Sequence, residues 1–369
     1  MCCKMLGPLA WTIALIMVLG TSASQARPAL YVNGNASALS YKILQLADVH
    51  ISGNSSTICE DAPRGMAPAD CTEALTMAFM KDLLDCEQPD FVVFSGDNVQ
   101  TYGPPDHQAA IDNVTSAVEN LGIPYAMIFG NHDDEGGLSR EKIVRLVSKK
   151  KHSYTESGPE DVDGVGNYVL NFKAPIDGAW GAKGDDVLRM YFLDSGAKAH
   201  SDEYPFVFSE YDWIRESQIK YYGALSAAGR ESSGGVLLPA IMFFHIPLFE
   251  FEFSASGCHG EHHDRLHNQG VNLRLLSAVA KIGEVKTIFV GHDHLNEYCC
   301  LKDGIQLCYS GGTGFGRAYG SPDFTRRARV IEWSVDHANR REIRSWKRHW
   351  GDVNVVHSEE VLYTETSGV

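Results

Sequence analysis

The sequence predicts an α/β domain in which helices cover the faces of a β-sheet. From Tyr41 onward, short apolar runs alternate with amphipathic segments whose apolar residues recur at helical spacing. The chain has 369 residues, 44% of them hydrophobic, which is enough for one large core or two modest ones. No internal repeat, charge block or long linker interrupts the alternation. We therefore place this domain at about residues 41–350.

Apolar runs of strand length and amphipathic segments of helix length make up the alternation. The expected strands are Ile43–Ala47, Phe91–Ser95, Tyr125–Phe129, Val187–Leu193, Leu237–Phe244, Thr287–Val290 and Ile305–Tyr309. The expected helices are Thr72–Leu84, Gln108–Asn120, Arg140–Ser148, Tyr211–Ala227 and Asn272–Ile282. The segment Phe249–Asn268 has neither period and is expected to be a surface insertion.

The first 26 residues have the features of an export signal. Lys4 gives a positive start, and the apolar run Leu9–Leu19 is short for a membrane span. An uncleaved anchor is the alternative. We expect a signal peptide over 1–26, an N-terminal segment over 27–40, the main domain over 41–350 and a peripheral C-terminal tail over 351–369. The mature chain is then secreted, or lies in the lumen of the secretory or vacuolar pathway, without a stable membrane anchor.

Sequons and cysteines agree with export. Asn35, Asn54 and Asn113 each begin an Asn-x-Ser/Thr triplet. Seven of the nine cysteines follow the leader, so several should pair in an oxidising compartment and at least one is left over. They are Cys59, Cys71, Cys86, Cys258, Cys299, Cys300 and Cys308.

Two disulfides can be predicted from local pattern. Asp303-Gly304 is a hairpin turn signal, and counting outward from it places Cys299 opposite Cys308. A one-residue shift of the turn would pair Cys300 with Cys308 instead. Cys59 and Cys71 could close a short loop.

Residue types that bind metals follow five of the expected strands directly. The blocks are Asp48-Val49-His50, Gly96-Asp97-Asn98, Gly130-Asn131-His132-Asp133, Phe244-His245-Ile246 and Gly291-His292-Asp293-His294. A lone His or Asp after a strand is more often a turn residue or a satisfied polar group than a metal ligand, so each block alone is a weak signal. Together they offer carboxylate, imidazole and amide ligands at the strand ends, where open α/β sheets bind their ligands. The sequence therefore predicts one metal centre.

The ordered set D-x-H, G-D, G-N-H-D, H and G-H-x-H resembles the calcineurin-like metallophosphoesterase superfamily over about residues 41–350. The resemblance implies a four-layer α/β/β/α sandwich and two metal ions. Asp48, His50, Asp97 and His294 would hold one ion. Asp97 would bridge to a second ion held by Asn131, His245 and His292. His132 would lie beside the substrate phosphate, where it is free to protonate the leaving oxygen.

Within that superfamily the chain is most similar to purple acid phosphatase-like proteins that lack the long N-terminal domain. Purple enzymes carry glycine where this chain has His50, and a tyrosine ligand where it has Gln100. Tyr102 is nearby but out of register. The difference argues against an iron–tyrosinate centre and leaves iron, manganese or zinc as the two divalent or trivalent ions.

The expected function is hydrolysis of phosphate monoesters, acid phosphatase-like, by a metal-bound hydroxide. A phosphodiesterase or nucleotide-cleaving hydrolase is the alternative, and an inactive binding protein is a remote third. The partner is a small phosphorylated substrate. A net charge of −15 argues against a nucleic-acid surface. Arg317 and His259 are candidate substrate contacts, His259 within an insertion that either rims the site or forms a third metal site.

Overall fold

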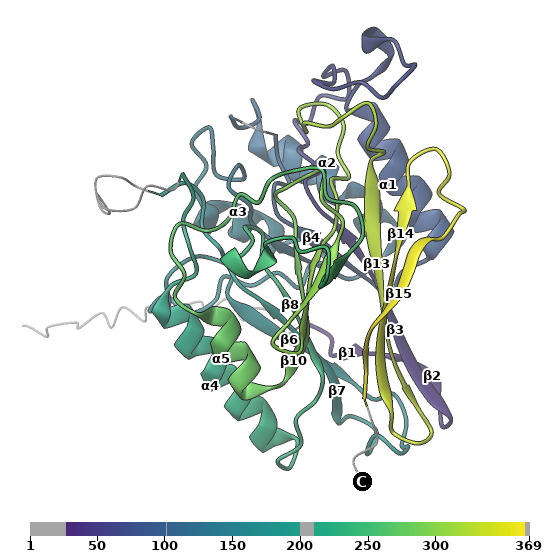
Figure 1. The fold of residues 1–369 in the computed structure, drawn as a ribbon, viewed down its shortest axis with the longest axis vertical. Helices are drawn as coiled ribbons and strands as arrows, with labels where there is room; N and C mark the ends of the chain where they lie inside the picture. The colour runs from purple at the N-terminus through teal and green to yellow at the C-terminus, as the bar shows by residue number, and fades with distance from the viewer. Residues whose placement is uncertain (1–26, 101, 200–209, 366–369) are drawn as a thin grey trace, which may run out of the picture.

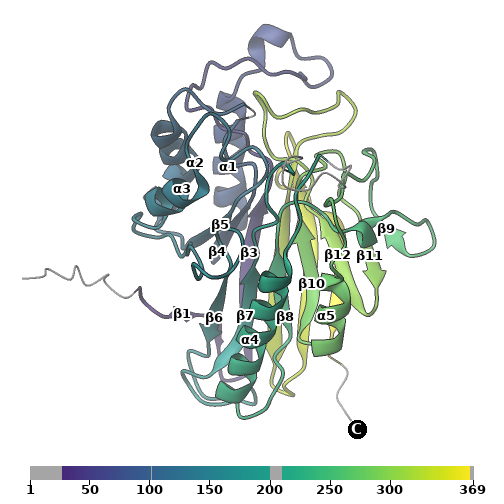
Figure 2. The same ribbon diagram turned by 90° about the vertical axis from the view of Figure 1, so that its left-hand side faces the viewer.

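The computed structural model describes residues 27–100, 102–199 and 210–365, which form four layers (Figure 1). Two β-sheets lie face to face. Helices α1 (Ala74–Glu87), α2 (His107–Leu121) and α3 (Arg140–Val147) cover one outer face. Helices α4 (Glu216–Ser232) and α5 (Leu275–Ile282) cover the other (Figure 2). The predicted four-layer α/β/β/α sandwich is confirmed, and the expected signal peptide at 1–26 lies outside the described residues.

The first sheet has a parallel centre and antiparallel margins. Its order is β1 (Leu30–Tyr31), β6 (Tyr168–Lys173), β7 (Asp186–Phe192), β8 (Ala240–Phe243), β10 (Val285–Val290), β12 (Ile305–Tyr309), β11 (Cys299–Lys302) and β9 (Cys258–His259). Strands β7, β8, β10 and β12 pair in parallel. Their carboxyl ends therefore open at one edge of the molecule.

The second sheet combines three parallel strands with an antiparallel meander. Its order is β15 (His357–Thr364), β14 (Arg341–His349), β13 (Arg327–Asp336), β3 (Ala38–Leu46), β4 (Phe91–Ser95) and β5 (Tyr125–Ile128), while β2 (Asn33–Asn35) pairs with β3. Strands β3, β4 and β5 are parallel. Every residue of β4 is buried, because one face meets the first sheet and the other meets helices.

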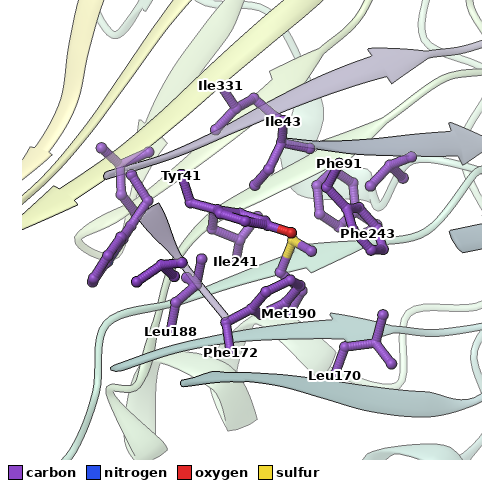
Figure 3. Close-up of a cluster of buried hydrophobic side chains, with 14 of the residues drawn as sticks. Tyr41, Ile43, Phe91, Leu170, Phe172, Leu188, Met190, Ile241, Phe243 and Ile331 are labelled. Carbon is purple, nitrogen blue, oxygen red and sulfur yellow. The ribbon is translucent and has the colours of Figure 1, made fainter. Parts of the chain in front are cut away.

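The central core lies between the two sheets (Figure 3). Tyr41 and Phe91 from the second sheet meet Phe172 and Met190 from the first. The Phe91 and Phe172 rings are 5.6 Å apart and edge-to-face. Two further apolar clusters fill the spaces between each sheet and its helices. This packing fixes the sheets relative to each other, and with them the loops at their carboxyl ends.

The structure differs from the sequence prediction in one helix start and in several strands. Helix α4 begins at Glu216 and not at Tyr211, because the Gln218 side chain accepts the Arg215 backbone N–H and caps the helix there. Strands β6, β13 and β14 were not predicted. The segment expected to be a peripheral tail contains β15, which pairs with β14 and belongs to the second sheet.

Four charged side chains, three of them buried, explain why the last strands were missed. Arg329 and Lys347, on neighbouring strands, both contact Glu360 of β15 at 3.0 Å. Lys347 also lies 3.1 Å from Glu297. A sequence rich in arginine and lysine suggests a solvated loop, but here the charges are neutralised inside the sheet.

Both predicted disulfides are present, Cys59–Cys71 and Cys299–Cys308. A third, Cys258–Cys300, was not predicted, and it fastens the insertion to β11. Cys86 is the free cysteine of the described residues. No helix in the described ranges is both long and apolar enough to cross a membrane.

The buried charge cluster predicts a large effect of Glu360→Gln on stability. The change leaves Arg329 and Lys347 without their shared carboxylate, so the unfolding free energy should fall by about 3 kcal/mol. The matched control is Glu359→Gln, whose side chain pairs with half-exposed Arg344 and should change stability by less than about 1 kcal/mol. Urea unfolding of the two variants makes the comparison, and equal effects would contradict it.

Candidate metal centre

The predicted ligands follow parallel strands of both sheets. Asp48 and His50 come after β3, Asp97 after β4 and Asn131 after β5. His245 follows β8 of the opposite sheet, and His292 and His294 follow β10. The two sheets thus deliver their carboxyl-end loops to a common position.

The side chains form two overlapping groups. Asp48, His50, Asp97 and His294 each offer a ligand atom within 4.8 Å of the others. Asp97, His245 and His292 do the same. The shared member is Asp97, the residue predicted to bridge. The Nε2 atoms of His50 and His294 are 3.2 Å apart, as expected when two imidazoles point at one ion.

Three donor atoms of the ligands predicted for the second ion have no hydrogen-bond partner within the described structure. They are Asn131 Oδ1, His245 Nε2 and His292 Nε2, and all are buried. Asn131 is held there by its neighbours, because the His132 backbone N–H donates to Asp97 Oδ1 at 2.9 Å. Buried polar atoms without partners are rare and costly, which fits a ligand set for metal ions.

Backbone carbonyls orient two of the imidazoles. His245 Nδ1 donates to Ser95 O at 2.9 Å, and His294 Nδ1 donates to Tyr319 O at 2.8 Å. The Tyr319 ring also stacks on His294 at 3.7 Å. Each contact fixes the tautomer and leaves Nε2 directed at the centre, the usual way a protein prepares a metal-binding histidine.

The backbone at the site is strained. Asp48, His50, Asp97 and His292 have positive φ angles of 54°, 44°, 49° and 77°. Residues other than glycine seldom adopt positive φ angles, and those that do cluster at functional sites. Asp48 and His50, two residues apart in the chain, both belong to the first group of ligands.

Glycines in the motifs allow close packing around the ligands. A Cβ added at Gly96 would lie 2.3 Å from His245 Nδ1. One added at Gly130 would lie 2.1 Å from Asp97 Oδ1. These glycines are thus required by contact with the ligands as well as by the turns.

Burial sets the protonation of the imidazoles. It lowers the pKa of His50 to about 3 and that of His292 to about 4, so both are neutral at physiological pH, as metal coordination requires. Burial opposes charge on His245, but Asp97 and Asp48 outweigh it and raise its pKa to about 9. Burial also raises the pKa of Asp48 to about 8. Nearby cations would relieve both conditions by displacing the protons.

His132 lies at the edge of the centre, with its ring 5.5 Å from that of His50. Its Nδ1 contacts Glu135 Oε2 at 2.9 Å, and its side chain is 20% exposed. The residue therefore combines a fixed position with access to solvent. Glu135 was not identified from the sequence.

A second layer of carboxylates supports the motifs. Asp133 accepts the backbone N–H groups of Asn98 and Gly130, at 2.8 and 2.7 Å. Asp293 accepts Tyr309 O–H at 2.7 Å and His267 Nδ1–H at 2.6 Å. Both lie within motifs in the sequence, but pattern gives no indication of their partners.

The two candidate substrate contacts lie outside the ligand groups. Arg317 is exposed and pairs with Glu60 at 3.2 Å, beside a cavity of about 390 Å³ that Gln100 also lines. His259 lies on β9 and contacts Glu360 of β15. The substrate roles of both stay predictions.

The fold and the convergent acidic and histidine ligands define a metallophosphoesterase. The calcineurin-like phosphoesterase model matches residues 41–296, and the chain belongs to this family. It is 31% identical over 332 residues to probable inactive purple acid phosphatase 14 of Arabidopsis thaliana, covering 86% of this chain and 79% of that one. Phosphatase DCR2 of Saccharomyces cerevisiae is 32% identical over 325 residues, covering 84% and 53% of the two chains.

Solved structures agree on the fold. A dimetal phosphatase from Danio rerio superposes with a TM-score of 0.55 at 14% identity, covering 87% of this chain and 98% of that one. Purple acid phosphatase PPD1 from yellow lupin gives a TM-score of 0.52 at 14% identity, covering 89% and 55%. The chain shares the fold of these two proteins, and it has a buried Asp/His cluster that could bind metals.

Loss of single ligands should separate the two metal positions. Asp97→Ala should lower the bound content of both metal ions, since Asp97 belongs to both groups. His245→Ala should mainly lower occupancy of the second metal position, and His50→Ala should mainly lower occupancy of the first. Elemental analysis of the purified variants, with circular dichroism as a check on folding, measures this. Equal and unaltered metal content in all three would mean that these residues do not form the site.

The residue at position 100 predicts the colour of an iron-loaded sample. Gln100 donates its amide to Gly103 O at 3.0 Å, and Tyr102 is 81% exposed. Without a tyrosine ligand the sample should lack an intense visible charge-transfer band. A violet colour in active protein would contradict the ligand assignment.

Proposed function

We propose that this chain is a secreted phosphatase that hydrolyses phosphate monoesters at a two-metal centre. The observation that carries the proposal is the convergence of six aspartate and histidine side chains, together with the buried Asn131 Oδ1 and His292 Nε2 atoms, which have no hydrogen-bond partner in the described structure. Hydrolysis by two metal ions requires a complete set of ligands of this kind. We therefore propose an active enzyme, although several relatives are named probable inactive phosphatases.

Two metal ions would supply Lewis acidity and lower the pKa of the attacking water. The rest depends on the chain itself. Asp48, His50, Asp97 and His294 hold one position, and Asp97, Asn131, His245 and His292 hold the other. The neutral Asn131 ligand keeps the total negative charge low. His132, next to Asn131 in the chain and in contact with Glu135, would donate a proton to the leaving oxygen.

Export is the second part of the proposal. Three disulfides occur among the described residues, and structural disulfides persist in oxidising compartments. The apolar leader at 1–26 gives the same indication. Expression with and without residues 1–26, followed by N-terminal sequencing of the protein recovered from the medium, tests export directly.

Removing the His132 imidazole should matter most for poor leaving groups. General acid catalysis contributes about 10²–10⁴-fold, so His132→Ala should lose that much kcat/KM on alkyl phosphates and far less on nitrophenyl phosphate. Metal content should be unchanged. Equal losses on both substrates would exclude the general-acid role, and no loss would remove His132 from the mechanism. The bis(nitrophenyl) ester, assayed alongside, distinguishes the phosphodiesterase alternative.

A further inference from the structure

One side chain of the Phe249–Asn268 insertion, His267, lies on the His292 side of the metal centre, and a second, Arg265, contacts it; neither belongs to the ligand set. The His267 ring lies 6.2 Å from the His292 ring. Arg265 contacts His267 in turn, with 2.9 Å between Arg265 Nε and His267 Nε2. We call Arg265 and His267 the insertion pair.

The insertion is attached firmly to the metal-binding loop. Asn296 Oδ1 accepts the backbone N–H groups of His263 and Asp264, at 3.1 and 2.9 Å. Asp264 Oδ2 accepts the Leu295 N–H at 3.0 Å. The Cys258–Cys300 disulfide adds a covalent link. The insertion pair is therefore held in position by the same loop that carries His292 and His294.

A chain of hydrogen bonds orients the arginine. Tyr309 O–H and His267 Nδ1–H both donate to the buried Asp293 carboxylate, at 2.7 and 2.6 Å. With its proton on Nδ1, His267 accepts the Arg265 Nε–H through Nε2. The order of donors fixes the imidazole tautomer and directs one edge of the guanidinium at His267. The two terminal nitrogens of Arg265 stay available as donors.

Arg265 has no carboxylate partner among the described residues, although the chain has a net charge of −15. Arg317, by contrast, pairs with Glu60, and Arg329 pairs with Glu360. An exposed guanidinium held beside a phosphoesterase centre is suited to bidentate binding of a carboxylate or a phosphate.

We propose that Arg265, oriented by His267, binds a second anionic group on the substrate while the ester phosphate occupies the metal centre. The preferred substrates are then phosphate esters with a further carboxylate or phosphate near the ester. This inference rests on the proposed phosphatase function and deepens it. It also assigns the anion-binding role to an arginine of the insertion.

Two three-carbon esters test the proposal. Glycerol 3-phosphate and 3-phosphoglycerate both have alkoxide leaving groups, but only 3-phosphoglycerate carries a carboxylate. Arg265→Gln should lower kcat/KM for 3-phosphoglycerate about 10–100-fold, as expected for loss of a hydrogen bond to a charged group. The loss should appear mainly in KM. The value for glycerol 3-phosphate should change less than about 3-fold, because its binding does not use this contact.

Control variants separate a specific contact from general effects. Arg265→Lys, which keeps the charge but loses the planar fork, should restore part of the preference. Arg230→Gln removes the same charge from the exposed face of α4, where Arg230 Nε donates to Gly235 O, and should leave both substrates unchanged. Parallel losses on the two esters with Arg265→Gln, or no loss on either ester together with unchanged pyrophosphate binding, would overturn the proposal.

Binding measurements distinguish failure of this inference from failure of the proposed function. Calorimetry on the metal-loaded protein gives the affinity for each ester without requiring turnover. If neither ester is hydrolysed, the phosphatase function fails. The insertion pair is then still supported when Arg265→Gln weakens 3-phosphoglycerate binding alone, and rejected when both esters bind the variant and the wild type equally. A third outcome, pyrophosphate and not 3-phosphoglycerate weakened by the variant, would replace the carboxylate with a phosphate as the second group.

Discussion

The metal centre depends on the interactions of one buried carboxylate, that of Asp97. One of its oxygens accepts the His132 backbone N–H, and the other lies 3.2 Å from His245 and 3.6 Å from His50. Asp97 thus joins motifs of the second sheet to a histidine from the first. A carboxylate buried this deeply is stable only with compensating positive charge, so the sandwich is arranged around a place where cations belong.

That requirement explains features that would otherwise be unfavourable. Four ligands have strained backbone, three donor atoms are buried without hydrogen-bond partners, and two aspartates lie close together. The apolar core between the sheets and the helices outside them stabilise this arrangement. Stability and function are therefore separated in space, with packing at the sheet faces and chemistry at the carboxyl ends of the strands.

The names of several relatives suggest an inactive protein, whereas the chemistry of the site residues in this chain suggests an active one. Several relatives are called inactive, whereas every ligand expected for two metals is present here and the structure brings the aspartates and histidines together. A family fold can be kept without its reaction, so function has to be argued from the site. The partners of His132 and His267 extend that argument beyond the ligands, to groups that position a proton and a guanidinium.

The sequence by itself determined the central parallel strands, the outer helices and the ligand motifs, because apolar periodicity and fixed motif spacing are local properties. For the disulfides it left Cys300–Cys308 as an alternative to Cys299–Cys308. Tertiary structure alone decided the rest. Strands β13 and β14 are hidden in the sequence because Arg329 and Lys347 become compatible with a sheet only when Glu360 neutralises them. Likewise Glu135, Asp293 and Arg265 gain their roles from partners in the folded chain. A pattern reports which face of an element is apolar, whereas the pairing of buried charges depends on which distant residues meet.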